Sequence, residues 1–159
     1  MITYQREQVS DVLSEIKPLL EMHWREIAHY QDIPLEPLWD WYQRAPGVRV
    51  FTARLNGELI GYVVFGIGPS KHYSGSIQAA QDILYLHPEH RAGRTGYKLI
   101  KYCDEQLRAE GVQVVYQHAK VAKDFGRLLV AIGYEPVDTI YGRRLDKENP
   151  HGCNGIRSR

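Results

Sequence analysis

The chain has 159 residues, of which 43% are hydrophobic and 25% are charged, a composition that fits one globular domain with a sizeable core. Its 20 lysines and arginines nearly balance 19 aspartates and glutamates, so the formal net charge of +1 gives no overall field toward nucleic acid or an anionic membrane. Any basic site must therefore be local, and neither nucleic acid nor a membrane is expected as a partner.

The N-terminus and the cysteines indicate the compartment. The sequence MITYQREQVSD lacks the charged-then-apolar order of a secretion signal, and no apolar run approaches the roughly 18 residues of a membrane span. Cys103 lies in an apolar helical stripe and Cys153 in a polar tail, which favours two free thiols over a disulfide. We expect a soluble, cytoplasmic protein.

Residues 1–40 are predicted to be helical. Residues spaced by three or four positions share one face: Val12, Ile16, Leu19, His23 and Ile27. Pro18 removes a backbone donor from this run, so we expect two short helices in place of one. A further short helix is predicted after Ile33, where Pro34 and Pro37 suit a first turn.

Three strands are predicted next. Val48–Leu55 is rich in β-branched and aromatic residues, Asn56-Gly57 is a strong hairpin signal, and residues 58–67 form the partner strand. An exposed loop at residues 71–75 separates them from a third strand at residues 76–86. This segment is therefore predicted to be an antiparallel meander.

The second half of the chain alternates helices and strands. Residues 93–110 form an amphipathic helix that ends before Gly111, and its apolar stripe comprises Leu99, Ile100, Cys103 and Leu107. Residues 112–118 form a strand parallel to the preceding one, because a helix joins the two. Another helix ends at Gly133, and residues 134–145 are predicted to hold one or two final strands.

The segment ILYLHPEHRAGRTG, residues 83–96, predicts an anion site. The first N–H groups of a helix lack internal partners and lie at the positive end of the helix dipole, and glycines let a phosphate approach the backbone. Arg91 and Arg94 are locally unfavourable at this helix start unless an anion binds. The G-x-x-x-x-G-K-S/T and G-x-G-x-x-G patterns are absent, so the pyrophosphate of coenzyme A fits better than ATP or NAD.

With these motifs the chain resembles the GCN5-related N-acetyltransferase (GNAT) superfamily. The family's coenzyme loop reads Gln/Arg-x-x-Gly-x-Gly/Ala; Arg91 and Gly96 match it, Arg94 stands at the usual middle glycine, and Gly93 lies one place early. A helix that closes with Gly133-Tyr134 is similar to the second signature of the family. The segments PLLEMHW and RAGRTGYKLI also resemble sequences of acetyltransferases of tailed bacteriophages. This resemblance implies that the protein works in the cytoplasm of a bacterium or a phage-infected host.

The resemblance implies an α/β (α+β) fold over residues 1–145: a mixed, mostly antiparallel sheet with a central parallel β-α-β crossover and flanking helices. Residues 146–159 lie beyond it and are predicted to be a disordered tail. Acetyl-coenzyme A is the implied co-substrate. Its predicted contacts are Tyr85, Leu86, Arg91, Ala92, Gly93, Arg94, Thr95, Gly96, Tyr97 and Lys123.

Two departures from the family pattern concern the second motif. Leu129 stands where the family often has a tyrosine that protonates the leaving thiolate. Ala122 and Lys123 stand near the position of an asparagine that commonly contacts the pantetheine arm. The family's usual proton donor is therefore missing.

Asp82 is the leading candidate for the general base, because it lies on the strand before the coenzyme loop, four residues from Leu86 and hence on the same face. It could instead pair with an arginine or end a strand. A backbone N–H near Tyr85 or Leu86 could oppose the developing oxyanion. The candidate proton donors, each of which packing or hydrogen bonding also explains, are Tyr116, His118 and Tyr141.

We expect an N-acetyltransferase that moves an acetyl group from acetyl-coenzyme A to a primary amine of a small molecule or protein by direct attack in a ternary complex. The early helices, residues 71–75 and the last strands would form the acceptor cleft. Acidic residues that could attract the amine are Glu21, Glu26, Glu36 and Asp40. The alternative is a non-catalytic binding module that keeps the coenzyme A pocket, which the missing tyrosine and altered glycine favour.

Two further expectations concern metals and assembly. No spacing among the seven histidines, His23, His72 and His87 included, indicates a metal site. The exposed edge of the final strands, which carries Tyr141, could pair between subunits of a homodimer.

Overall fold

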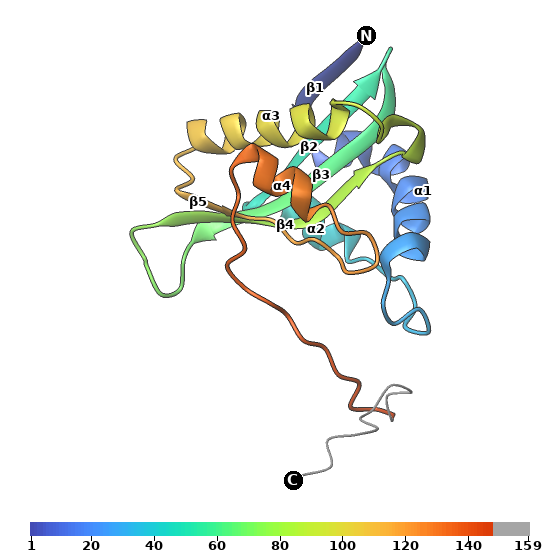
Figure 1. Ribbon diagram of the computed structural model, residues 1–159, viewed down its shortest axis with the longest axis vertical. Helices are drawn as coiled ribbons and strands as arrows, with labels where there is room; N and C mark the ends of the chain where they lie inside the picture. The colour runs from blue at the N-terminus through green and yellow to red at the C-terminus, as the bar shows by residue number, and fades with distance from the viewer. Residues whose placement is uncertain (148–159) are drawn as a thin grey trace.

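The computed structural model describes residues 1–147, so most of the predicted tail and Cys153 lie outside the described residues. The elements are β1 (Ile2–Glu7), α1 (Val9–Ile27), α2 (Trp39–Arg44), β2 (Val48–Leu55), β3 (Glu58–Pro69), β4 (Ile77–Leu86), the 3-10 turn η1 (Pro88–His90), α3 (Thr95–Ala109), β5 (Val114–Tyr116) and α4 (Gly126–Ile132) (Figure 1). No helix within residues 1–147 is long and apolar enough to cross a membrane.

The strands form one five-stranded sheet in the order β1-β2-β3-β4-β5. The first four pair antiparallel, and β5 joins β4 in parallel after the α3 crossover. The hairpin at Asn56-Gly57 is confirmed, since both residues adopt the positive φ that a tight turn of this kind requires. The predicted mixed sheet with a parallel β-α-β unit is confirmed.

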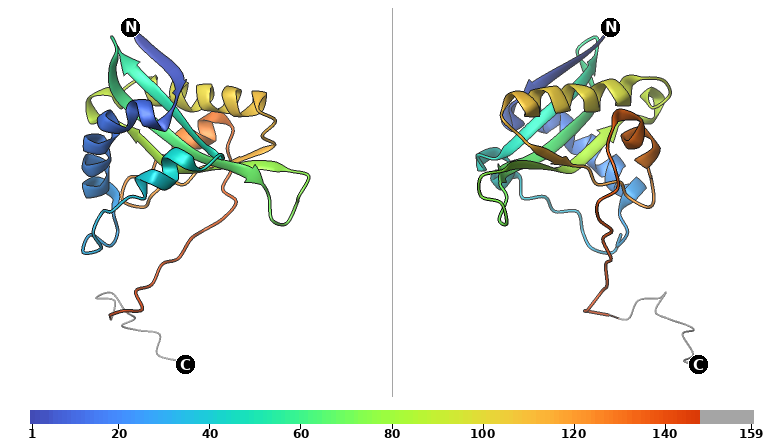
Figure 2. Two further views of the ribbon diagram at one scale, coloured as in Figure 1. Left: turned by 180° about the vertical axis from the view of Figure 1, so that it is seen from behind. Right: turned by 60° about the vertical axis from the view of Figure 1, so that its left-hand side comes forward.

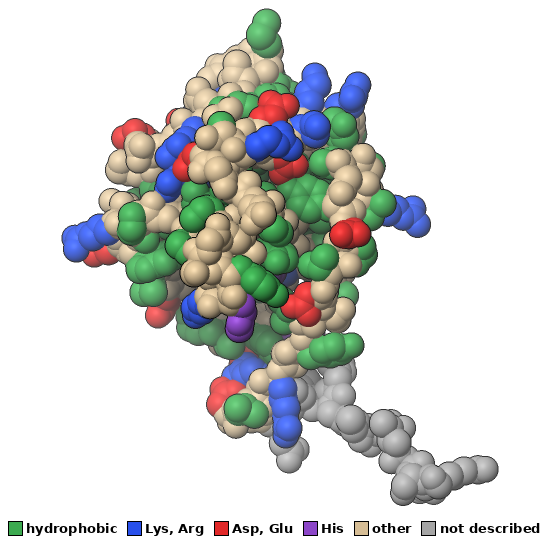
Figure 3. Space-filling model, turned by 90° about the vertical axis from the view of Figure 1, so that its left-hand side faces the viewer, with side chains coloured by type: hydrophobic (Ala, Val, Ile, Leu, Met, Phe, Trp, Pro, Cys, Tyr) green, Lys and Arg blue, Asp and Glu red, His purple; other side chains and the backbone are tan. Residues whose placement is uncertain are grey.

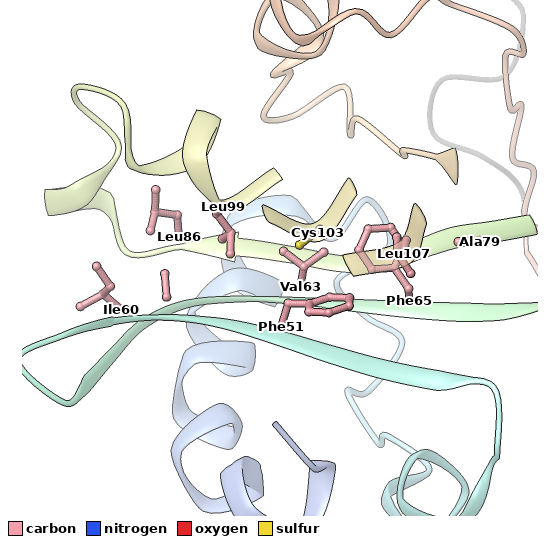
Figure 4. Packing of buried hydrophobic residues seen from close by; sticks show 10 residues of the cluster. Phe51, Ile60, Val63, Phe65, Ala79, Leu86, Leu99, Cys103 and Leu107 are labelled. Atoms are coloured by element: carbon pink, nitrogen blue, oxygen red, sulfur yellow. The ribbon is translucent and has the colours of Figure 1, made fainter. Parts of the chain in front are cut away.

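Helices cover both faces of this sheet (Figure 2). Alternate residues of the central strands point to opposite sides: Phe51 and Val63 pack under α3, whereas Val50 and Tyr62 pack against α1. Figure 4 shows the α3 cluster, in which Cys103 is buried and free, as predicted for that thiol. Because both faces are buried, the sequence of β3 is a nearly continuous apolar run.

Two predictions about the N-terminal region are wrong. Residues 2–7 are a strand, and Ile2 and Tyr4 pack against the α3 cluster. The following residues form one helix of 19 residues with Pro18 inside it. Pro18 and Ser14, whose carbonyl the proline leaves without a helical partner, are both exposed, so water can solvate that carbonyl while the buried face remains continuous.

The predicted final strands are absent from the described part of the chain. After α4, Tyr134 anchors the segment by donating from its hydroxyl to Asp104 at 2.5 Å, and the chain then runs away from the sheet (Figure 1). Tyr141 is 91% exposed. The β-like sequence of residues 134–145 thus forms no ladder with β5, and the strand edge expected to carry Tyr141 into a dimer is not formed.

The surface shows no single-sign field on the face in Figure 3, where positive and negative side chains are interspersed with apolar ones. This agrees with the near-zero net charge.

Candidate functional site

The sheet opens between β4 and β5. Within residues 1–147, β5 pairs with β4 only along Gln78–Ala80, although β4 continues to Leu86 (Figure 1). The buried Gln81 side chain closes the paired part, because its Oε1 accepts a hydrogen bond from the His118 N–H at 2.7 Å. Beyond Gln81, the edge of β4 that faces β5 has no ladder partner within residues 1–147, and we call this unpaired edge the opening.

The main chain of Leu86 faces this opening. The next residue, His87, donates its N–H to the Ile60 carbonyl across β3 at 2.7 Å, and strand alternation then directs the N–H and carbonyl of Leu86 away from β3. The Leu86 carbonyl accepts from Arg91 Nε at 2.8 Å on that side. By the same alternation the N–H of Tyr85 points to β3, so of the two predicted residues Leu86 is the one that presents a donor to the opening.

The loop after β4 ends at the start of α3. Gly93 has φ +93°, and Lys98 donates the first helical hydrogen bond to the Arg94 carbonyl at 2.9 Å. The N–H groups of Thr95, Gly96 and Tyr97 therefore precede the helical ladder and point out of the helix end. The Arg94 guanidinium lies over the Tyr97 ring at 5.4 Å and forms no ion pair within residues 1–147. This set of amides with one arginine is suited to a diphosphate.

Arg91 has a different role from Arg94. Its guanidinium makes a bidentate ion pair with Glu26 of α1, at 2.6 and 2.8 Å, and stacks over the Tyr85 ring. The hydrogen bonds from Arg91 lower the pKa of Glu26. Lys123 Nζ lies 3.9 Å from the same carboxylate. Arg94 thus has no carboxylate partner within residues 1–147, and its contact with a phosphate stays a prediction. The charge of Arg91, in contrast, is paired with Glu26, and this pair joins the loop to α1.

Asp82 lies at a β-bulge. The register between β3 and β4 shifts at Val64/Phe65, and this extra residue in β4 breaks the two-residue alternation. Leu86 packs under α3, whereas Asp82 faces cavities on the α1 side. The expectation that the two share a face is wrong for this reason.

The partner of Asp82 is a tyrosine. The Tyr42 hydroxyl donates to Asp82 Oδ2 at 2.5 Å, and burial together with this carboxylate raises the pKa of Tyr42. The alternative reading, in which Asp82 pairs with an arginine, is not what the structure shows. From the sequence alone, Tyr42 was interpreted as a core residue. Its position beside the Asp82 carboxylate follows only from the fold.

Two cavities meet at Asp82. One has a volume of about 450 Å³ and lies among α1, residues 30–37, α2 and the sheet; the other, of about 380 Å³, reaches the opening at Gln81 and His118. Tyr42 and Asp82 line both. The carboxylate thus stands where a ligand in the first cavity would meet one in the opening.

Of the three predicted proton donors, one lines a cavity at the site and two do not. His118 lines the second cavity together with Asp82. Tyr116 and Tyr141 line neither cavity, and both are exposed. Tyr141 is excluded from this site because its segment forms no strand, and Tyr116 belongs to the last paired position of β5, before the opening begins.

Two buried tyrosines and a half-buried histidine lie near the site; of these, only Tyr85 was predicted to take part in it. The hydroxyls of Tyr62 and Tyr85 are buried with no hydrogen-bond partner in the described chain. The His23 ring lies 5.2 Å from that of Tyr85, and burial lowers the pKa of His23 to about 4. His23 is therefore neutral at pH 7. Sequence periodicity marks Tyr62 and His23 only as residues of the inner face of a strand and a helix.

One group of side chains could hold a metal ion. The ligand atoms of His87, Glu89 and His90 lie within 4.8 Å of one another on η1. The sequence did not point to this cluster, whose two histidines, three positions apart, meet on a 3-10 turn; proximity alone does not make it a metal site, and the expectation of none stays a prediction. The three side chains are near the coenzyme loop but outside both cavities.

Comparison with solved structures relates this arrangement to acetyltransferases. A ribosomal-protein-alanine N-acetyltransferase from Brucella melitensis biovar Abortus 2308 has a TM-score of 0.71 at 20% identity, covering 91% of this chain and 99% of that one. An aminoglycoside acetyltransferase from an uncultured soil metagenomic sample gives 0.70 at 15% identity, with 90% and 96% covered. A predicted acetyltransferase with acetyl-CoA from Clostridium acetobutylicum gives 0.66 at 10% identity, with 91% and 97% covered.

Sequence comparison gives the family. A search of the curated proteins found no match. The model of the acetyltransferase (GNAT) family matches residues 15–127, which is most of the chain and includes the opening, the coenzyme loop and Asp82. The protein therefore belongs to the GNAT family of acetyl-coenzyme A-dependent N-acyltransferases.

Proposed function

We propose that the protein transfers the acetyl group of acetyl-coenzyme A to a primary amine of a small molecule or protein by direct attack in a ternary complex. The observation that supports this proposal is the unpaired edge of β4, which has the exposed amides at the start of α3 at one end and Asp82 at the other. Relatives of this fold include acetyltransferases of a ribosomal-protein alanine and of aminoglycosides, which supports an amine acceptor.

The start of α3 would hold the diphosphate of the coenzyme. The N–H groups of Thr95, Gly96 and Tyr97 are free of helical partners, and Arg94 adds a positive charge. Gly93, at φ +93°, gives the turn that exposes these amides. Arg91 fixes the loop against α1 through Glu26.

The Leu86 N–H would polarise the acetyl carbonyl. It faces the opening and is part of a rigid strand, so it can oppose developing negative charge with no reorganisation. The coenzyme supplies an activated thioester whose thiol, with a pKa near 8.5, leaves readily. This accounts for Leu129, a buried residue, at the position of the family's usual acid.

Asp82 would remove the proton of the attacking ammonium group. A strand rises about 3.3 Å per residue, so Asp82 stands about 13 Å from Leu86 along β4 and acts through water. Tyr42 orients the carboxylate by its hydrogen bond, and its raised pKa keeps that hydroxyl protonated.

The experiment that tests this function measures binding and turnover separately. Isothermal titration with acetyl-coenzyme A and coenzyme A should show saturable binding, and thiol release should depend on added amine. Absence of coenzyme binding would overturn the proposal. Binding without release against any amine would instead favour the non-catalytic module, which Leu129 supports.

A further inference from the structure

The larger cavity is suited to the body of a ligand. Its volume of about 450 Å³ lies within the range of small-molecule sites. It is bounded by α1 and α2, by the loop of residues 30–37 and by the face of the sheet that carries Val64 and Ile83. Its wall is therefore built from elements that share no residue with the coenzyme loop.

The residues that line this cavity are mostly apolar, and those that carry a charge are all acidic. Aromatic and proline side chains contribute much of it, including Trp24, Trp39 and Pro34. The charged residues that line it are Glu36 and Asp82, both acidic, and no lysine or arginine of the described chain is among them. Such a wall attracts a cationic group and offers almost no partners for further polar groups.

The cavity is connected to the reacting centre through Asp82. Tyr42 and Asp82 line both cavities, and the second cavity reaches Gln81 and His118 at the opening of the sheet. An amine that reaches Asp82 through water, with its nitrogen directed along the edge of β4 toward the thioester, would place its substituent in the larger cavity.

We propose that the acceptor is a monoamine with an apolar body, an alkylamine or arylalkylamine. This inference rests on the proposed acetyl transfer. In the reaction the ammonium group first loses one proton by way of Asp82 and water. The amine nitrogen then bonds to the acetyl carbon, the carbon–sulfur bond breaks, and the second proton lost by the nitrogen passes through water to the thiolate, so that amide, thiol and one released proton are formed. A polyhydroxylated or multiply charged amine would lose hydration in this cavity without gaining partners, so it is a poor acceptor.

The first test is a binding titration that does not depend on turnover. Trp24 and Trp39 line the cavity, so their fluorescence reports its occupancy. Titration with n-alkylamines from propylamine to hexylamine, with and without saturating coenzyme A, should give a saturable signal. The dissociation constant should fall about fourfold for each added methylene. A flat series, or no saturable signal under either condition, would overturn the proposal.

The second test uses a matched pair of variants. Ile33 lines the cavity and is 47% exposed, whereas Leu38 is 73% exposed and does not line it. Ile33→Gln should weaken hexylamine binding about fivefold to tenfold, and Leu38→Gln should leave it unchanged. Equal effects of the two variants would contradict the assignment of this cavity.

A turnover comparison separates failure of this inference from failure of the proposed function. With acetyl-coenzyme A, hexylamine and phenylethylamine should exceed kanamycin and a lysine peptide in kcat/KM at least tenfold. If kanamycin or the peptide is preferred, acetyl transfer stands and the apolar acceptor is wrong. If no amine supports thiol release while the alkylamine titration shows the expected series, the cavity assignment stands and the proposed function is wrong.

Discussion

The two faces of the sheet are built differently. Under α3, Phe51, Phe65, Leu99 and Leu107 are at most 1% exposed and form a closed apolar cluster. Under α1 the packing includes tyrosine hydroxyls without partners in the described chain, a half-buried histidine and a cavity of about 450 Å³. The close-packed face supports the coenzyme loop, which must hold its amides in one geometry. The hollow face carries the polar groups and is where the proposed acceptor would bind.

The largest effect is expected at Asp82, where this hollow face meets the opening. Asp82→Asn keeps the shape of the side chain and removes its basicity, so kcat/KM for the amine should fall about 100-fold to 1,000-fold. Steady-state thiol release measures the loss. Asp11→Asn, a change at an exposed carboxylate in the first turn of α1, is the control and should be near wild type. Equal activity of the Asp82 variant would assign deprotonation to another group or to water alone.

The next effect concerns the pH dependence of stability on the α1 face. His23 faces Glu26, Arg91 and Lys120, and burial lowers its pKa to about 4 from 6.5. Because the unfolded chain takes up a proton at a higher pH than the folded chain, this site's stabilisation is complete above pH 6.5 and is lost as the pH falls toward 4. Urea unfolding should show a loss of about 2 kcal/mol over that window, beyond the loss in His23→Gln. Parallel pH profiles of the two proteins would show that His23 is not buried as a neutral ring.

A smaller effect is expected at the coenzyme end. Arg94→Glu places a carboxylate beside the predicted diphosphate and should weaken acetyl-coenzyme A binding about tenfold to thirtyfold. Calorimetry measures the affinity, and Lys101→Glu, an exposed change of the same charge further along α3, serves as the control. Unchanged affinity in the Arg94 variant would mean that the phosphates bind elsewhere.

The smallest effect is expected at the ion pair that joins the two regions. Glu26→Gln removes one charge of the Arg91–Glu26 pair and should cost about 1 to 2 kcal/mol of unfolding free energy at pH 7. The pKa of Glu26 is lowered in the folded state, so its contribution is present above pH 4.5 and is lost as the pH falls through the folded-state value. The difference between variant and wild type should therefore shrink in acid unfolding curves. A constant difference would exclude the charge of Glu26 as its cause.

Local sequence was sufficient to predict an element where one turn or periodicity signal was strong. The hairpin at Asn56-Gly57 and the apolar stripe of α3 were predicted because turn chemistry and helical period act over a few residues. The start of α3 was found in the same way, since a loop with glycine that leads into a helix exposes amides whatever surrounds it. Pro18 misled the prediction of α1 because buried contacts on both sides of it outweigh a local backbone cost.

The site needed contacts between distant segments. Asp82 was identified from its position before the loop, but a bulge in β4 decided which face it lies on, and α2 supplied its partner Tyr42. The pairing of Arg91 with Glu26 joins residues 65 positions apart. No local pattern encodes such pairs.

The sequence by itself determined the order of most elements and the exposed amides at the start of α3, because these depend on periodicity, turn chemistry and the unpaired N–H groups of a helix end. Its motifs, through their resemblance to known acetyltransferases, indicated the family. The tertiary structure alone decided which charges remain free, where β4 and β5 separate and which face of the sheet is hollow. Those features depend on strand register and on side chains far apart in the chain, and burial fixes both only when the whole domain packs.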